Sequence, residues 1–210
     1  MKRLLSALCL LLAATTTLPA WAQAWPSKPV KIVLQFPPGG STDAVARILA
    51  QALQASLGQT VLVENRPGAD GAIAGDFVAR SEPDGHTFFL ASNTPMMQVP
   101  LLKKNPPYDP VKSFTPVSLV GRYIYVLVTS PTLPAKDVNE LLAYARANPG
   151  KLGYGSYSGV TQLMHTNLKL AKAETNLVPY KGEAPTVTDI LGNHVQMTFA
   201  TPASTLPHIK

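Results

Sequence analysis

The chain has 210 residues, of which 46% are apolar and only 14% are charged, and its formal net charge is +6. This composition is typical of a folded, lightly charged protein with one or two compact domains. Apart from the pair Lys103-Lys104 the basic residues are scattered, without an arginine-rich stripe or a basic helix. Nucleic acid is therefore excluded as an expected partner.

The first 24 residues have the three parts of a secretory signal peptide. Lys2 and Arg3 form the charged start, an apolar middle follows, and small residues allow cleavage after Ala22 or Ala24. A membrane anchor is the alternative, but the apolar run is too short to span a bilayer comfortably. We therefore predict an exported protein, and loss of Lys2 and Arg3 lowers the formal charge from +6 to +4.

Cys9 is the only cysteine, and it lies inside the predicted signal peptide. Leu8 precedes it in place of a small residue, which argues against lipid attachment at this cysteine. The mature protein would have no thiol, so disulfides, cysteine catalysis and thiolate metal sites are excluded.

Alternating strands and helices are predicted in the first part of the mature chain. Apolar runs and helical spacing give, in chain order, a strand, a helix, a strand, a helix and a strand at residues 30–36, 43–57, 60–65, 72–81 and 86–91. Gly58 follows the first helix, where a left-handed cap is favoured. The third strand leads into a loop with hydroxyl groups at its tip, at residues 92–95.

The loop between the first strand and the first helix is the strongest candidate binding segment. Gly39 and Gly40 can adopt positive φ, and they allow a ligand to approach the backbone closely. Ser41 or Thr42 is a good N-cap, and the free amide groups of a first helical turn form an anion site with the helix dipole. The alternative is a tight turn followed by a capped helix without any ligand.

The second part begins with an irregular, proline-rich stretch at residues 100–116, in which residues 108–110 are expected to form a turn on the surface. Residues 117–129 are strand-rich and are expected to cross between two lobes. Asp137 and Glu140 have the spacing of a capping box. Helices are predicted at residues 137–148, 162–171 and 183–191, and strands at residues 151–155, 176–178 and 195–200.

This alternation predicts an α/β fold with parallel strands wrapped by helices. Ligands of such sheets bind beyond the carboxyl ends of the strands. The loops at these ends are residues 37–43, 92–95, 155–161, 180–183 and 200–202.

Other site chemistries lack their residue patterns. Ser158 replaces the third glycine of a dinucleotide fingerprint, and no glycine-rich loop ends in Lys-Ser or Lys-Thr. Neither Ser156 nor Ser158 has the flanking glycines of a nucleophile elbow. The histidines show no metal-ligand spacing, and no close Asp/Glu pair suggests glycosidase chemistry. We expect no catalytic residues, no metal and no cofactor.

Seven ordered motifs resemble the Bug-type receptors, which are the periplasmic substrate-binding proteins of tripartite tricarboxylate transporters. They lie at residues 36–47, 63–69, 83–87, 108–114, 147–152, 178–182 and 206–210. The resemblance implies a two-lobed, type II-like periplasmic-binding-protein fold that closes on a small organic acid. The predicted division is a signal peptide at residues 1–24, a first lobe at 25–122 and a second lobe at 123–210.

The resemblance also implies that backbone amides, hydroxyls and waters hold the ligand carboxylate, with few charged side chains. On the first lobe the candidate ligand-binding residues are Phe36, Pro38, Gly39, Gly40, Ser41, Thr42, Asp43 and Thr94. Asp43 has two open roles, to hold ordered water in the pocket or to complement the helix dipole. On the second lobe the candidates are Ser156, Tyr157, Ser158, Thr161 and Thr201, for which ordinary helix capping is the alternative role.

The function implied is that of a monomeric, non-catalytic periplasmic receptor that delivers a carboxylate to membrane transporter subunits. The alternatives are a sensor that presents the bound carboxylate to a signalling partner and an exported enzyme that uses the same cleft.

Two features depart from the family pattern. Residues 160–164 lack the small-residue loop ending in Ser-His or Thr-His of many relatives, which leaves the second-lobe contacts open. Residues 201–210 contain Pro202 and Pro207 without a predicted closing element, so we expect a chain cut short. The resemblance implies a further portion beyond residue 210 that returns to pack on the first lobe. Without it that lobe would expose apolar surface and a strand edge, and we expect the product to be aggregation-prone or partly unfolded and to bind no carboxylate measurably.

Overall fold

The computed structural model describes residues 24–209, so the predicted signal peptide lies almost entirely outside the described residues. A first sheet has three parallel strands in the order β2-β1-β3. Its strands and their connecting helices are β1 (Val30–Leu34), α2 (Ser41–Leu57), β2 (Val61–Asn65), α3 (Ala72–Ala79) and β3 (Thr87–Phe89). All five elements confirm the sequence-based predictions.

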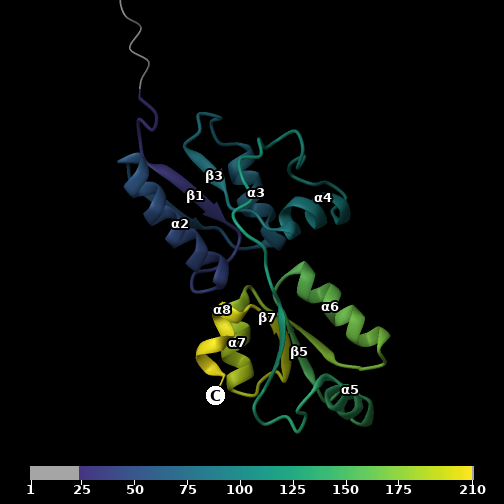
Figure 1. Cartoon of the computed structure of the whole chain (residues 1–210). Coiled ribbons are helices and arrows are strands. Elements are labelled where there is room, and N and C mark those ends of the chain that lie inside the picture. The colour runs from purple at the N-terminus through teal and green to yellow at the C-terminus, as the bar shows by residue number, and fades with distance from the viewer. Residues whose placement is uncertain (1–23, 210) are drawn as a thin grey trace, which may run out of the picture.

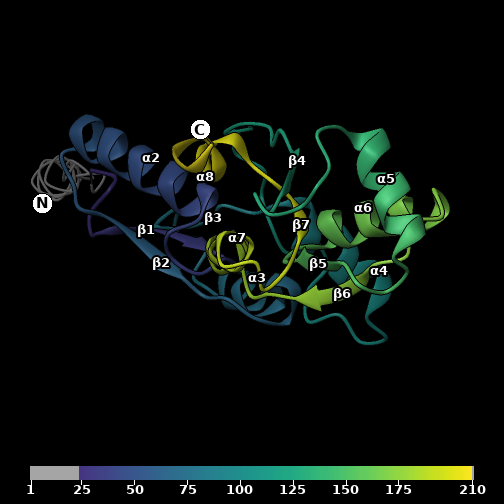
Figure 2. The same ribbon diagram turned by 90° about the horizontal axis from the view of Figure 1, so that it is seen from below.

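The central strand of this sheet is buried on both faces. Val30, Ile32, Val33 and Leu34 are each at most 2% exposed. Helices α2 and α3 lie on opposite sides of the sheet, as Figures 1 and 2 show. Burial from two sides explains why four of the five residues of β1 are apolar. The exception is Lys31, which is partly exposed and pairs with Glu64 at 3.4 Å.

A second sheet has four strands in the order β4-β7-β5-β6. Its elements are β4 (Val126–Thr129), α5 (Val138–Ala147), β5 (Gly153–Ser156), α6 (Gly159–Leu170), β6 (Asn176–Pro179), α7 (Glu183–Leu191) and β7 (Met197–Ala200). Strand β4 pairs antiparallel with β7, which corrects the prediction of parallel strands throughout. In Figure 1, α5 and α6 lie on one side of this sheet and α7 on the other.

The connection between the two sheets is less regular than predicted. After β3 the chain forms a short π-helical turn, η2 (Thr94–Gln98), and then α4 (Val99–Leu102). Only the last four residues of the predicted strand-rich stretch, those of β4, are a strand, because the preceding residues have no neighbouring strand with which to pair. This stretch passes from the first sheet to the second, as Figure 1 shows.

Three local predictions need correction. Tyr108 is only 5% exposed, so the turn predicted on the surface buries its aromatic ring, and its hydroxyl donates to the Pro95 carbonyl at 2.6 Å. The N-cap of α2 is Gly40, not Ser41 or Thr42, and it makes no side-chain cap bond. The final residues form α8 (Pro202–Thr205) and the 3-10 turn η3 (Leu206–His208), where no element was predicted.

The capping box predicted for α5 is half present. The Asp137 side chain accepts from the Glu140 amide at 2.9 Å, but the Glu140 carboxylate accepts from the Lys136 amide. Within residues 24–209, no helix has the length and apolar character needed to cross a membrane.

Candidate functional site

Asp43 stabilises the loop that precedes α2 by hydrogen bonds. Gly39 has a φ of +90°, which a glycine adopts without steric cost. The Asp43 carboxylate accepts from the Gly39 amide at 3.1 Å, from Arg47 Nε at 2.9 Å and from Asn65 Nδ2 at 3.0 Å. This side chain therefore fixes the loop against α2 and β2, and it lines neither of the two cavities described below.

The contacts of Asp43 predict an acid-dependent loss of stability. Burial would raise the pKa of Asp43, but hydrogen bonds from Arg47 and the Gly39 amide lower it below its usual value. A lowered folded-state pKa stabilises the protein above the unfolded pKa of about 3.9, and this contribution is lost as the pH falls through the folded pKa. Asp43→Asn should cost about 1–3 kcal/mol at pH 7 and much less once the pH has fallen below the folded-state pKa of Asp43, as measured by urea unfolding.

Asp76→Asn provides the control for this prediction. Asp76 makes the same i,i+4 pair with Arg80, but Arg80 is 75% exposed, so its loss should cost less than about 0.5 kcal/mol at either pH. An equal loss in the two variants would contradict a specific role of Asp43 in the loop.

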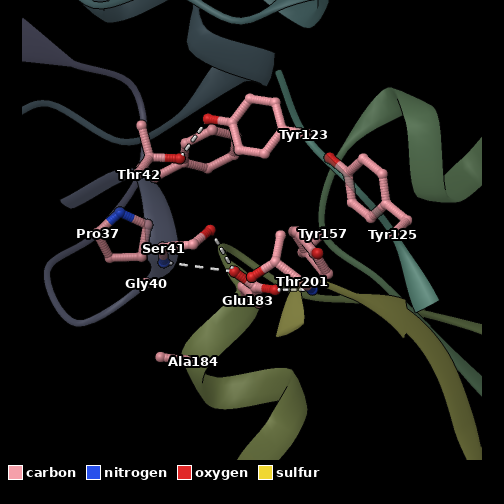
Figure 3. A pocket seen from close by; sticks show the side chains of 11 residues that line it. Pro37, Gly40, Ser41, Thr42, Tyr123, Tyr125, Tyr157, Glu183, Ala184 and Thr201 are labelled. Atoms are coloured by element: carbon pink, nitrogen blue, oxygen red, sulfur yellow. Dashed lines mark hydrogen bonds between the residues drawn. The ribbon is translucent and has the colours of Figure 1, made fainter. Parts of the chain in front are cut away.

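The carboxylate of Glu183, on helix α7 of the second sheet, lies at the N-terminus of α2. Glu183 begins α7 and is 5% exposed. Its carboxylate accepts from Ser41 Oγ at 2.7 Å and from the Ser41 amide at 3.4 Å (Figure 3). The Thr201 amide and Ser204 Oγ donate to its other oxygen. Burial would raise the pKa of Glu183, but these donors lower it, so the group is an anion at neutral pH.

A small cavity of about 20 Å³ lies beside this carboxylate. Three tyrosines contribute to its wall, and the Tyr123 hydroxyl is 2.6 Å from Thr42 Oγ1. Burial raises the pKa of all three phenols, that of Tyr125 to about 12, so they remain neutral hydrogen-bonding groups. The complete lining is Phe36, Pro37, Gly40, Ser41, Thr42, Tyr123, Tyr125, Tyr157, Glu183, Ala184 and Thr201.

A larger cavity of about 170 Å³ adjoins the small one, and Phe36 and Tyr157 line both. Its other lining residues are Gln35, Gly68, Ala69, Asp70, Gly71, Thr94, Ser158, Tyr180 and Lys181. Three of its buried polar atoms, Gln35 Oε1, Thr94 Oγ1 and the Tyr157 hydroxyl, have no hydrogen-bond partner within the described residues. Buried polar atoms are normally paired, so three unpaired atoms on residues that line one cavity make it a candidate ligand site.

Two helices begin at the larger cavity. Gly71 is the N-cap of α3 with a φ of +89°, and Ser158 is the N-cap of α6. The first amide groups of a helix and its dipole favour an anion at this end. The charged side chains at this cavity are one acid, Asp70, and one base, Lys181, so its side chains add no net charge to the effect of the two helix ends.

Eight of the residues proposed from the sequence line these cavities. Phe36, Gly40, Ser41, Thr42, Tyr157 and Thr201 line the small cavity, and Thr94 and Ser158 line the larger one. Pro38, Gly39, Asp43, Ser156 and Thr161 line neither. Thr161 is fully buried, and its hydroxyl accepts from the amides of Tyr157 and Ser158. It therefore stabilises the loop between β5 and α6 without lining a cavity.

Sequence reasoning missed Glu183, Tyr123, Tyr125 and residues 68–71 as lining residues. A signal existed for Glu183, because it ends the strand-exit loop at residues 180–183. Residues 68–71 follow β2 and could have been found by the same rule. The two tyrosines lie on an irregular stretch, and their sequence gave no indication of a cavity.

A family model described as the tripartite tricarboxylate transporter family receptor matches residues 45–210. The chain belongs to this family. Protein BugT of Bordetella pertussis is 38% identical over 216 residues, a match that covers 100% of this chain and 66% of BugT. The chain thus spans just under two thirds of the length of this curated relative.

Solved structures agree with the family assignment. Rpa4515 of R. palustris with adipate has a TM-score of 0.83 and 33% identity, covering 87% of this chain and 62% of that one. MatC of Rhodopseudomonas palustris with bound malate has a TM-score of 0.78 and 30% identity, and the match covers 87% of this chain and 63% of MatC. The periplasmic binding protein BugD has a TM-score of 0.77 and 33% identity, with coverages of 88% and 62%. These similarities confirm the predicted binding-protein fold.

Proposed function

We propose, in place of the sequence-based expectation that the chain binds no carboxylate measurably, that it binds a small carboxylate in the larger cavity. We propose further that it delivers this ligand to the membrane subunits of a tripartite tricarboxylate transporter. The observation that carries this proposal is the set of buried, unpaired polar atoms of Gln35, Thr94 and Tyr157 on one cavity. Their residues line a cavity beside the N-termini of α3 and α6, where an anion is favoured.

The size of the larger cavity supports a small ligand. Its volume of about 170 Å³ is below the range of roughly 300–1,000 Å³ that is typical of drug-sized ligands. The relatives with adipate and with malate support a small organic acid as the ligand class. Neither the family nor these neighbours favour a signalling partner or an exported enzyme.

The place and mode of action follow from the same proposal. We propose a periplasmic location, which the predicted signal peptide and the similarity to the periplasmic protein BugD support. The two sheets fall on either side of residue 122, which supports the proposed division into two lobes. We propose that the lobes close on the ligand and that the protein acts as a monomer.

Binding should appear as a thermal shift with at least one small acid. A ligand that binds only the folded state adds about 2.7 kcal/mol of stability at 100 times its dissociation constant. Thr94→Val removes the unpaired hydroxyl with little change of shape, and it should weaken binding about tenfold in calorimetry, or about 1.4 kcal/mol. The acids to be tested include malate, adipate, succinate, citrate and benzoate.

Thr166→Val is the matched control, because Thr166 is exposed on α6 and its hydroxyl donates to the Gln162 carbonyl. This variant should bind as the unmodified chain does. The absence of any thermal shift and any binding heat across the acids would refute the proposed function. If Thr94→Val and the unmodified chain bind with equal affinity, the Thr94 hydroxyl does not contact the ligand.

A further inference from the structure

Glu183 occupies an anion site that a ligand carboxylate could otherwise use. The N-terminus of α2 was predicted from its sequence to hold a carboxylate, and the carboxylate found there belongs to the chain itself. Its two oxygens accept from four donors, on Ser41, Thr201 and Ser204. Ser41, the first residue of α2, therefore already donates both its amide and its hydroxyl to Glu183.

The space left beside Glu183 is too small for a second carboxylate. A volume of about 20 Å³ is close to that needed by one water-sized group. A ligand anion in this cavity would also face the negative charge of Glu183 across a buried, tyrosine-lined space, where like charges repel more strongly than in water. Both volume and charge disfavour a dianion that spans the two cavities.

An uncharged polar group does fit this position. The three tyrosine rings give the small cavity apolar walls, and Tyr157, whose buried hydroxyl has no hydrogen-bond partner within the described residues, lines both cavities. Because Phe36 and Tyr157 line both cavities, a ligand whose carboxylate lies in the larger one would place its other end toward Glu183.

We propose that Glu183 is a specificity-determining residue that replaces one carboxylate of the ligand, so that this chain prefers monocarboxylates to dicarboxylates. The inference rests on the proposed function, since it assumes that an acid binds in the larger cavity. Adipate and malate, which are present in two of the similar structures, are both dicarboxylic acids, so the inference predicts that this chain binds them less well than their monoamides.

Isosteric pairs of ligands test the charge at the second end. Succinate and its monoamide succinamate have nearly the same shape and differ by one negative charge, and adipate and its monoamide form a longer pair. Calorimetry on the unmodified chain should give at least a tenfold preference for the monoamide in one of the two pairs.

Two variants test whether Glu183 is the cause. Glu183→Gln removes the charge and keeps the size, and it should reduce the preference for the monoamide at least fivefold. Glu183→Ala frees the donors at α2 and enlarges the small cavity, and it should reverse the preference in favour of the diacid. Glu174→Gln removes an exposed carboxylate outside both cavities and should leave the preference unchanged.

The outcomes separate the inference from the proposed function. If the diacid binds the unmodified chain as well as the monoamide does, or if the Glu183 variants keep the original preference, the inference fails and the receptor function stands. If no acid or monoamide binds, the proposed function fails and the inference fails with it. Thermal melts identify a variant that does not fold, and the preference of the unmodified chain then decides alone.

Discussion

Gly71→Val is expected to abolish carboxylate binding. Gly71 has a φ of +89°, which a β-branched residue adopts only with strain. A Cβ at this position would lie 3.0 Å from the Cβ atoms of both Gln35 and Pro95, so the new side chain would displace the wall of the larger cavity. We expect affinity for any acid that binds the unmodified chain to fall about 100-fold or more, which is about 2.7 kcal/mol.

Gly58→Val separates backbone strain from the loss of the cavity. Gly58 has a φ of +64° at the end of α2, and no atom lies within 4 Å of a Cβ built there. The strain alone should cost about 1–2 kcal/mol of stability and leave acid binding intact. Calorimetry and thermal melts on both variants make the comparison. Normal binding by folded Gly71→Val would show that the ligand lies elsewhere.

The strands and helices could be predicted because their physical causes are local. Four of the five residues from Val30 to Leu34 are apolar, and α2 has apolar residues at helical spacing. The antiparallel pairing of β4 with β7 could not be predicted, since strand direction depends on the path of an irregular connection. The burial of Tyr108 could not be predicted either. The neighbouring prolines indicated a surface turn, but the Tyr108 ring packs against Gly75, which is distant in the sequence.

The site was predictable to the extent that parallel strands bring their carboxyl ends together. That rule found Phe36, Thr94 and Ser158, which lie far apart in the sequence. It could not show that Glu183 would fill the anion site at α2, because this contact joins residues 142 positions apart. Glycine conformation was also beyond sequence reasoning, since Gly39 has positive φ while Gly40 is extended.

The second expected result concerns Tyr154, which joins the core of the second sheet to the site loop. Its side chain is fully buried on β5, its ring centroid is 5.0 Å from that of His165, and its hydroxyl donates to the Thr161 carbonyl at 2.7 Å. Tyr154→Ala should cost about 3–5 kcal/mol, the range for loss of a large aromatic side chain from a core. Because domains are stable by only about 5–15 kcal/mol, this variant should lose much of its total stability.

Chemical denaturation of two further variants separates the contribution of the hydrogen bond from that of the buried ring. Tyr154→Phe tests the hydrogen bond, and Leu163→Ala is the exposed control. Tyr154→Phe keeps the ring and removes one hydrogen bond, and it should cost about 0.5–1.5 kcal/mol. Leu163 lies on α6 and is 61% exposed, so Leu163→Ala should change stability by less than about 0.5 kcal/mol. A cost for Tyr154→Ala no larger than that for Leu163→Ala would contradict the packing of β5 against α6. Since Thr161 also orders the amides of Tyr157 and Ser158, a folded Tyr154→Phe protein with weakened acid binding would show that the core positions the site loop.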